Sequence, residues 1–155
     1  MSTVLYRGAA QTDIPSMARL RAATWGSEEY WTTRIAAYMN LTHAPRKALE
    51  PRVAYVAIIN NSVAGFIAGH LTTRNACVGE LQWIDVAREY QRGGIASVLL
   101  ARLAAWFAQQ NALRICVDVE PSNAIARAFY RKHGAVDLRK SWMVWEDIRT
   151  VLERA

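Results

Sequence analysis

The sequence predicts a mixed α/β fold, in which helices pack on a central sheet. One observation is the strand-like alternation and β-branched content of segments such as residues 63–71. Another is the spacing of Ile95, Leu99 and Leu103, which places apolar side chains on one face of a helix. The length of 155 residues is enough for one hydrophobic core, so we expect a single domain over residues 1–155.

The predicted elements are a strand, two helices, three strands, a helix, a strand, a helix and one or two closing strands. Asn60 and Asn61, followed by Ser62, are typical of a hairpin turn between two of these strands. The expected strands are residues 3–7, 53–59, 63–71, 79–86 and 114–119, with closing strands within 136–145. The expected helices begin at Ile14 and Ser27, span 95–111, and run from 121–123 to a terminating Gly134; residues 42–51 are expected to form a loop.

The chain is basic, with a net charge of +6 and a pI of about 9.7. Such a surface can meet nucleic acid, a polyphosphate or an acidic substrate. The Lys and Arg residues are scattered, without a basic tail or an RNA-binding motif, so nucleic acid is not the expected partner. The longest apolar run, residues 53–59, is too short to cross a bilayer, and the first residues do not resemble a signal peptide. We therefore expect a cytoplasmic protein with no membrane partner.

The two cysteines, Cys77 and Cys116, have no CxxC or Cys/His spacing around them. They are interpreted as reduced, buried thiols, because free cysteine is among the most buried residue types. No metal site is predicted.

The segment from Gln91 to Ala96 (QRGGIA) stands where a strand passes into a helix. A helix N-terminus offers unpaired backbone N–H groups and a partial positive charge, which together suit a phosphate. Glycine at positions 93 and 94 lets the backbone approach an anion closely, and Arg92 can add charge-assisted hydrogen bonds. An ordinary glycine-rich turn with incidental arginines explains the same residues, and both readings stay open on spacing alone.

Two motifs resemble those of the GCN5-related N-acetyltransferases (GNAT). Residues 90–96, which follow Val86, resemble the family's Q/R-x-x-G-x-G/A signature, with Ala96 where glycine is commoner. Residues 123–134 resemble its N-x-x-A-x-x-x-Y-x-x-x-G helix. The resemblance implies the acyl-CoA acyltransferase fold: a mostly antiparallel sheet with one splayed parallel strand pair and about four helices on both faces. It also implies acetyl-CoA as co-substrate. The implied cofactor contacts are Ile84, Val86, Arg88, Gln91, Arg92, Gly93, Gly94, Ile95, Ala96, Ser97, Asn123, Ala126, Phe129 and Tyr130.

The resemblance assigns catalytic roles to a backbone amide and a phenol. The Val86 N–H would bond the acetyl carbonyl, an interaction that strengthens as oxyanion charge develops. Tyr130 is the candidate general acid, because a phenol with a pKa near 10 stays protonated at neutral pH and can donate to the departing thiolate. A core tyrosine on an apolar helix is the alternative.

The general base is assigned to a carboxylate. Glu80 and Asp118 match offsets at which some family members keep a catalytic glutamate, although either can equally be a solvated strand carboxylate. Strand parity predicts Glu80 on one face with Gln82, Ile84 and Val86. His70 is expected opposite Glu80 across the hairpin, more readily as a structural residue than a catalytic one.

Acceptor binding is predicted at Trp25, Tyr30 and Trp31, because the family's first two helices usually form the acceptor wall. With Glu28 and Glu29, these aromatic residues would suit a cationic amine. A buried aromatic stripe on a surface helix explains them equally well.

The predicted function is therefore direct acetyl transfer from acetyl-CoA to a primary amine, of a small molecule or a peptide. One alternative is a catalytically idle acyl-CoA-binding or regulatory domain. The other is a toxin-like acetyltransferase of aminoacyl-tRNA, suggested by the basic pI alone. The edges of the closing strands make a homodimer a further expectation.

Overall fold

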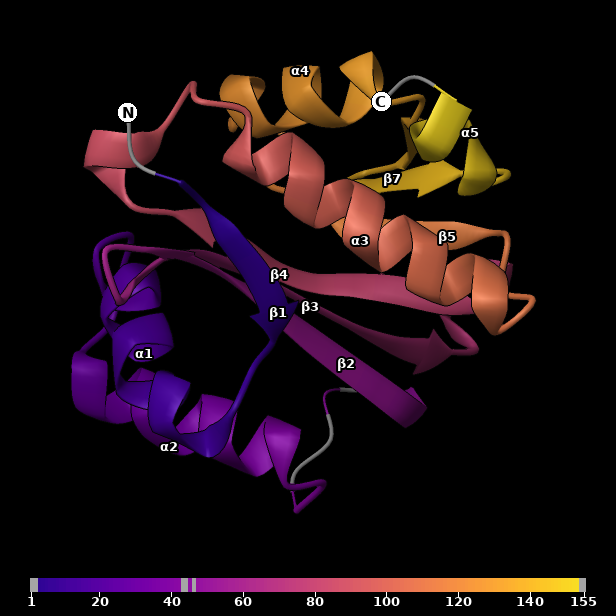
Figure 1. The fold of residues 1–155 in the computed structure, drawn as a ribbon. Helices are drawn as coiled ribbons and strands as arrows, with labels where there is room; N and C mark the ends of the chain where they lie inside the picture. Colours follow the sequence, from indigo (N-terminus) through magenta and orange to yellow (C-terminus); the bar gives the residue numbers. More distant parts are fainter. Residues whose placement is uncertain (1–2, 43–44, 46, 154–155) are drawn as a thin grey trace.

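The computed structural model describes residues 3–42, 45 and 47–153, which form a seven-stranded sheet with helices on both faces (Figure 1). The strand order is β1-β2-β3-β4-β5-β7-β6. Neighbouring strands are antiparallel except for the β4–β5 pair, which is parallel. The predicted mixed α/β fold with one parallel pair is confirmed.

The predicted strands and helices occur in the predicted order. The strands are β1 (Leu5–Gly8), β2 (Ala48–Ile59), β3 (Ser62–Thr72), β4 (Gly79–Val86), β5 (Ile115–Asp118), β6 (Val136–Arg139) and β7 (Trp142–Trp145). The helices are α1 (Ile14–Ala22), α2 (Glu28–Met39), α3 (Ile95–Gln109), α4 (Ala124–Lys132) and α5 (Arg149–Glu153).

Local signals explain several of these boundaries. Asn60 and Asn61 both adopt positive φ, at 50° and 65°, and make the tight turn of the β2–β3 hairpin. Ser27 caps α2, since its Oγ accepts a hydrogen bond from the Tyr30 N–H at 3.0 Å. Gly134, with φ +102°, follows the end of α4 as predicted.

Two differences from the sequence prediction stand out. Strand β2 begins at Ala48, inside the segment 42–51 that was expected to be a loop; residues 43, 44 and 46 of that segment lie outside the described residues. The pairing of β2 with β3 is irregular between Leu49 and Arg52. Pro51, which has no N–H to donate, lies in this irregular stretch, so no regular hydrogen bond between the strands is lost. The short helix α5, which packs on α3, was not predicted.

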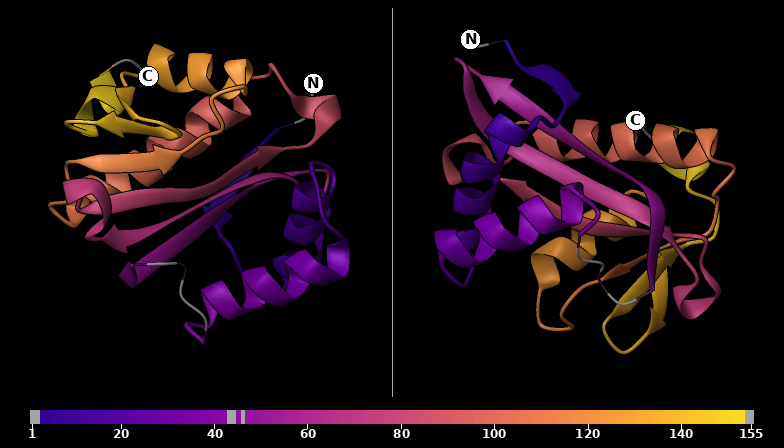
Figure 2. Two further views of the ribbon diagram at one scale, coloured as in Figure 1. Left: turned by 180° about the vertical axis from the view of Figure 1, so that it is seen from behind. Right: turned by 90° about the horizontal axis from the view of Figure 1, so that it is seen from below.

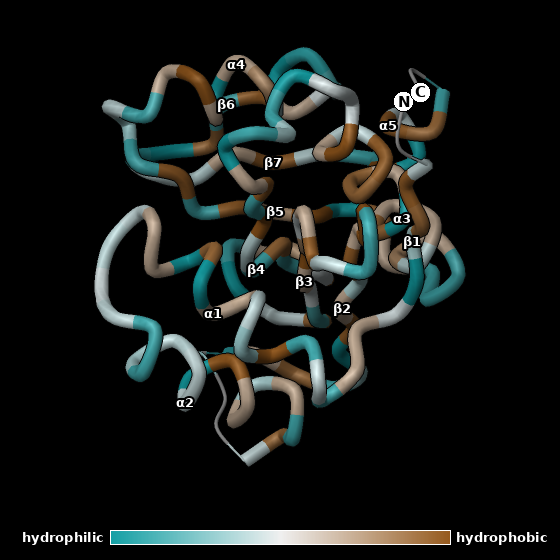
Figure 3. The backbone as a smooth tube through the Cα atoms, turned by 60° about the vertical axis from the view of Figure 1, so that its left-hand side comes forward, coloured by the Kyte–Doolittle hydropathy of each residue, from teal (hydrophilic) through white to brown (hydrophobic). Residues whose placement is uncertain are grey.

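The two faces of the sheet carry separate hydrophobic cores. Helices α1 and α2 cover one face, and α3, α4 and α5 cover the other (Figures 1 and 2). The α3-side core joins Leu99, Leu103 and Phe107 to strand residues such as Ile67. The opposite core joins Ile35 and other apolar residues of α1 and α2 to β2, β3 and β4. Hydrophobic stretches of the chain accordingly gather in the middle of the molecule (Figure 3).

None of the helices in the described part of the chain is long and apolar enough to span a bilayer.

Strands β4 and β5 pair over only three residues and then diverge (Figure 2). The last pair is Leu81 with Val117. Beyond it, residues 83–86 of β4 pair with β3 on one side, and residues 82–86 have no β5 partner on the other. This segment is called the unpaired edge of β4 below.

A β-bulge at Gln82 changes which side chains of β4 share a face. Opposite β3, Leu81 pairs with Gly69 and Trp83 with Ala68, so Gln82 is an extra residue. The predicted parity is therefore wrong beyond this point. Glu80 faces α2, whereas Ile84 and Val86 pack against the α3-side core.

Candidate active site

The turn into α3 has the open backbone that an anion site requires. Gly94, the N-cap of α3, adopts φ +87°, and a Cβ added there would meet no atom of the described residues within 4 Å. The other left-handed residue of the turn is Arg92, at φ 67°, and not Gly93. Residues 91–94 are all exposed. The turn thus combines a conformation that favours glycine with free space in front of its backbone.

The amides of this turn are available to a ligand. The Val98 N–H donates to the Gly94 carbonyl at 3.1 Å, so the helical hydrogen bonds begin there and the preceding amides lie at the positive end of the helix. Arg88 and Arg92 are exposed, and neither makes an ion pair within the described residues. Gln91 ties the turn to the end of β4, because its Nε2 donates to the Val86 carbonyl at 3.1 Å.

The other predicted cofactor residues fall on three neighbouring elements. Ile84 and Val86 lie on the unpaired edge of β4, half-buried against the α3-side core. In the first turn of α3, Ile95 is buried, while Ala96 and Ser97 are half-buried; the Ser97 hydroxyl lies 3.1 Å from His133 Nε2, which links α3 to the end of α4. On α4, Asn123 accepts a hydrogen bond from the Ala126 N–H at 3.1 Å, and Phe129 packs against Tyr130. Ile84, Val86, Ala126 and Phe129 therefore pack against the same core cluster, and the Ser97–His133 contact joins α3 to α4.

Tyr130 is a buried phenol without a hydrogen-bond partner among the described residues. Its ring packs edge-on against Trp145, with centroids 5.6 Å apart, and the residue is 5% exposed. Burial raises the pKa of Tyr130, and the negative charge of Asp85 on β4 raises it further. The hydroxyl therefore stays protonated at neutral pH, as a proton donor must.

Asp85 is a carboxylate that the sequence reasoning did not single out. It lies on the unpaired edge directly before Val86, and the bulge turns it towards α1. There its Oδ2 pairs with Arg21 Nη1 at 3.1 Å, with both side chains mostly buried. Burial raises the pKa of Asp85 to about 6, although Arg21 lowers it. No sequence signal identifies this pair, because its members are 64 positions apart.

Glu80 lies at the closed end of β4, in a buried polar cluster. It pairs with His70 across the hairpin, as predicted, and its Oε1 lies 3.5 Å from His70 Nε2 and 3.7 Å from Arg74 Nε. His70 Nδ1 is in turn 2.8 Å from the Tyr38 hydroxyl. These contacts give Glu80 and His70 structural partners.

Asp118 differs from the buried Glu80 in its exposure to solvent. It is exposed at the end of β5, where its backbone pairs with Trp142 of β7. The two predicted base candidates, Glu80 and Asp118, are thus held on different strands in very different surroundings.

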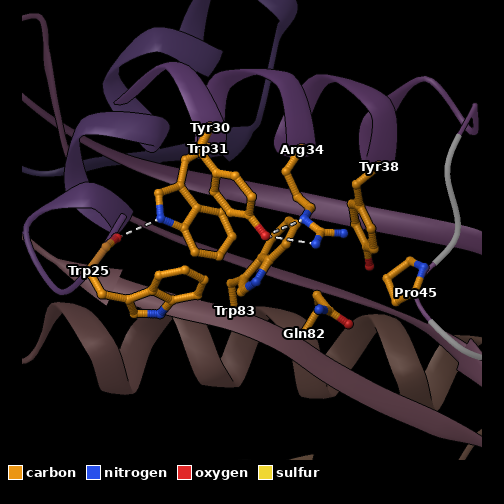
Figure 4. A pocket seen from close by; sticks show the side chains of 8 residues that line it. All are labelled: Trp25, Tyr30, Trp31, Arg34, Tyr38, Pro45, Gln82 and Trp83. Carbon is orange, nitrogen blue, oxygen red and sulfur yellow. Dashed lines mark hydrogen bonds between the residues drawn. The ribbon is translucent and has the colours of Figure 1, made fainter. Parts of the chain in front are cut away.

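An aromatic pocket of about 280 Å³ lies between α2 and β4 (Figure 4). The three predicted acceptor residues meet there: the Trp25 ring centroid is 5.6 Å from that of Tyr30 and 4.9 Å from that of Trp31. The described residues that line this pocket are Trp25, Tyr30, Trp31, Arg34, Tyr38, Pro45, Gln82 and Trp83. Gln82 and Trp83 are the first two residues of the unpaired edge, so the pocket is continuous with the β4 segment that precedes Val86.

The predicted acidic contribution to this pocket is not found. Glu28 pairs with Arg19 on the surface, at 3.7 Å, and Glu29 lines an adjoining hollow on α2 that shares Tyr30 and Arg34 with the pocket. The charged residue that does line the aromatic pocket, Arg34, was missed by the sequence reasoning.

A parallel strand pair that splays beside an open helix N-terminus, with the buried phenol of Tyr130 on α4, is the arrangement that the resemblance to acyl-CoA-dependent acyltransferases implies. Residues 15–135 match the family model "Acetyltransferase (GNAT) family". The chain belongs to this family.

Known proteins resemble the chain in sequence and in fold. An uncharacterized N-acetyltransferase of Methanocaldococcus jannaschii is 31% identical over 101 residues, which span 64% of this chain and 63% of that protein. A protein of Desulfovibrio desulfuricans assigned to the GNAT acetyltransferases superposes with a TM-score of 0.74 at 18% identity, covering 94% of this chain and 99% of its own. The PaiA N-acetyltransferase of Thermoplasma acidophilum, solved with coenzyme A, gives 0.66 at 18% identity and covers 92% and 96%.

Proposed function

We propose that the chain is an acetyl-CoA-dependent N-acetyltransferase that transfers the acetyl group directly to a primary amine. The observation that carries the proposal is the juxtaposition of the Gly94 turn with the unpaired edge of β4. The turn would bind the pyrophosphate through its amides, with Arg88 and Arg92 adding charge. The pantetheine arm would take the place of the missing strand along β4. That a structural neighbour binds coenzyme A supports a cofactor of this kind.

The chemistry requires a neutral amine, a polarised carbonyl and a proton for the leaving sulfur. The amine nitrogen attacks the thioester carbon while the Val86 N–H stabilises the charge on the oxygen. The C–S bond then breaks, and Tyr130 donates its proton to the thiolate, giving an amide and free coenzyme A. The raised pKa of Tyr130 supports this role, because the phenol is protonated at the start of each turnover.

Three carboxylates are candidates for the base, and we favour Asp85. It neighbours Val86, and its pKa of about 6 makes it ionised, yet still basic, at neutral pH. Glu80 is engaged by His70 and Arg74 at the closed end of the strand pair, and Asp118 is exposed on the other strand. Asp85 can take the amine proton directly or through one water.

The test is a panel of primary amines incubated with the full-length protein and acetyl-CoA, with detection of the released thiol and of the acetylated product by mass. Acetyl-CoA binding without thiol release for any amine would instead favour the idle acyl-CoA-binding alternative. The two free, buried cysteines fit a reducing compartment, which supports a cytoplasmic location.

A further inference from the structure

Arg21 lies where helix α1 meets the unpaired edge of β4. It is in the last turn of α1, where the negative end of the helix favours a cation. Its Nη1 donates to Asp85 Oδ2 at 3.1 Å, and the two side chains are only 17% and 14% exposed. The candidate base and its counter-ion are therefore withdrawn from solvent together.

The same guanidinium contacts the wall of the aromatic pocket. It lies 4.5 Å from the ring centroid of Trp31 and 6.0 Å from that of Trp83, and both rings line the pocket (Figure 4). A guanidinium can stack on a ring with its face while it donates hydrogen bonds from its edge. Its Nε is buried and makes no hydrogen bond within the described residues. Arg21 is thus held between the ring of Trp31 and the carboxylate of Asp85.

The elements packed around Asp85 present few groups that can change its charge. Within the described part of the chain, Arg21 of α1 is the charged group that acts on Asp85. Strand β3 places Phe66 opposite Asp85, and α2 presents the ring of Trp31 to Arg21. The phenol of Tyr130, on α4, has its pKa raised by Asp85 and lowered by Arg21. Loss of Arg21 would therefore keep Tyr130 protonated, and its main effect would fall on Asp85.

A buried carboxylate that loses its cation holds a proton more tightly. Burial disfavours the charged form, whereas an opposite charge within about 4–6 Å lowers the pKa of an aspartate by about 1–3 units. A protonated Asp85 cannot accept the proton of the attacking amine. The ability of Asp85 to act as a base therefore depends on the charge of Arg21.

We propose that Arg21 is a positioning residue for acetyl transfer, which keeps the Asp85 carboxylate ionised at the edge of β4 and fixes it relative to the aromatic pocket through Trp31. The inference rests on the proposed function, in which Asp85 is the general base, and it adds the residue on which that base depends. Arg21 acts through Asp85 and not by contact with acetyl-CoA. Its loss should therefore leave acetyl-CoA affinity unchanged in a direct binding measurement.

The test is the pH dependence of kcat/KM for an accepted amine, measured with the full-length protein and its variants. In Arg21→Gln the acidic limb should move upwards by about 1–3 pH units, because Asp85 has lost its cation. The loss of kcat/KM should be largest at low pH and should disappear at high pH, where Asp85 ionises without help. Arg21→Lys keeps a positive charge and should return the limb towards its wild-type position. Arg19→Gln, which removes the same charge from an exposed position of α1, is the matched control and should leave the limb unmoved.

A double variant separates action through Asp85 from damage to the fold. If Arg21 acts through Asp85, adding Arg21→Gln to Asp85→Asn should lower kcat/KM by less than about twofold more, because the two changes remove one interaction. A full additional loss in the double variant would show that Arg21 acts elsewhere, and would overturn the inference.

The failure of this inference is distinguishable from the failure of the proposed function. If Asp85→Asn loses the acidic limb but Arg21→Gln does not move it, the base stands and the role of Arg21 is refuted. An intact limb in Asp85→Asn would remove the proposed base, and with it the role of Arg21. If no amine releases thiol, the proposed function fails, and NMR titration of the Asp85 carboxyl carbon tests the dependence on Arg21 directly. The pKa of Asp85 should be higher in Arg21→Gln than in wild type, and equal values would refute the inference.

Discussion

Replacing Gly94 by alanine should weaken acetyl-CoA binding and destabilise the fold by separable amounts. At φ +87° a side chain is strained, which costs about 1–2 kcal/mol for an L-residue. For a chain of this length, each kcal/mol lowers the melting temperature by about 2–4 °C. No atom of the described residues lies within 4 Å of the added Cβ, so backbone strain is the stability cost expected in the free protein. The Cβ instead occupies the space in front of the turn, where the pyrophosphate would approach.

Calorimetry and thermal unfolding with and without acetyl-CoA separate the two effects. We expect the dissociation constant to rise at least tenfold, which removes about 1.4 kcal/mol of ligand stabilisation in addition to the backbone cost. Gly93→Ala is the matched control, because its φ is not in the left-handed region and its Cβ would lie 3.5 Å from the Tyr90 carbonyl oxygen, an ordinary contact. Normal acetyl-CoA affinity in a destabilised Gly94→Ala variant would show that this glycine serves the turn alone.

Three more perturbations test the site and the fold. Tyr130→Phe should lower kcat about 100-fold or more, as for loss of a general acid, with unchanged acetyl-CoA affinity in a direct binding measurement; a fully active variant would assign the proton to solvent. If Asp85 is the base, kcat/KM in wild type should fall about tenfold per pH unit below its pKa of about 6, because the proton then blocks the carboxylate. Asp85→Asn should lose this limb of the pH–rate profile and turn over slowly, whereas an intact limb would return the role to Glu80 or Asp118. Gly79→Ala should cost about 1–3 kcal/mol in denaturant unfolding, since its Cβ would lie 2.5 Å from Phe107 and 2.7 Å from Ile115. Gly8→Ala, with nothing within 4 Å, is its control, and equal stability of the two variants would contradict the packing described for the α3-side core.

The sequence was most informative where function depends on contiguous residues. The Gly94 turn and the α4 helix ending before Gly134 are local patterns, and each lies where it was predicted. The grouping of Trp25, Tyr30 and Trp31 was also predictable, because they are close in sequence at the start of one helix.

Contacts between distant elements could not be predicted in this way. The bulge at Gln82 leaves no mark in the residue types of β4, and strand parity therefore assigned Ile84 and Val86 to the same face as Glu80. The pairing of Asp85 with Arg21 depends on that same bulge and on the docking of α1. The charged groups around the aromatic pocket could not be predicted for a related reason: Glu28 pairs with Arg19 of α1, and Arg34 lines both the pocket and the adjoining hollow.

The bulge also sets a rule for how this strand can change over generations. Because the bulge places Gln82 and Trp83 on the same side of the sheet, deleting position 82 would restore the simple alternation and leave Ile84, Asp85 and Val86 on their present faces. A one-residue deletion at Ile84 would instead exchange the faces of the residues that follow it, so that Asp85 would point into the apolar core under α3 and Val86 would turn towards Arg21. Loss of the bulge should therefore be tolerated in related sequences more often than a change in the number of residues between Trp83 and Val86.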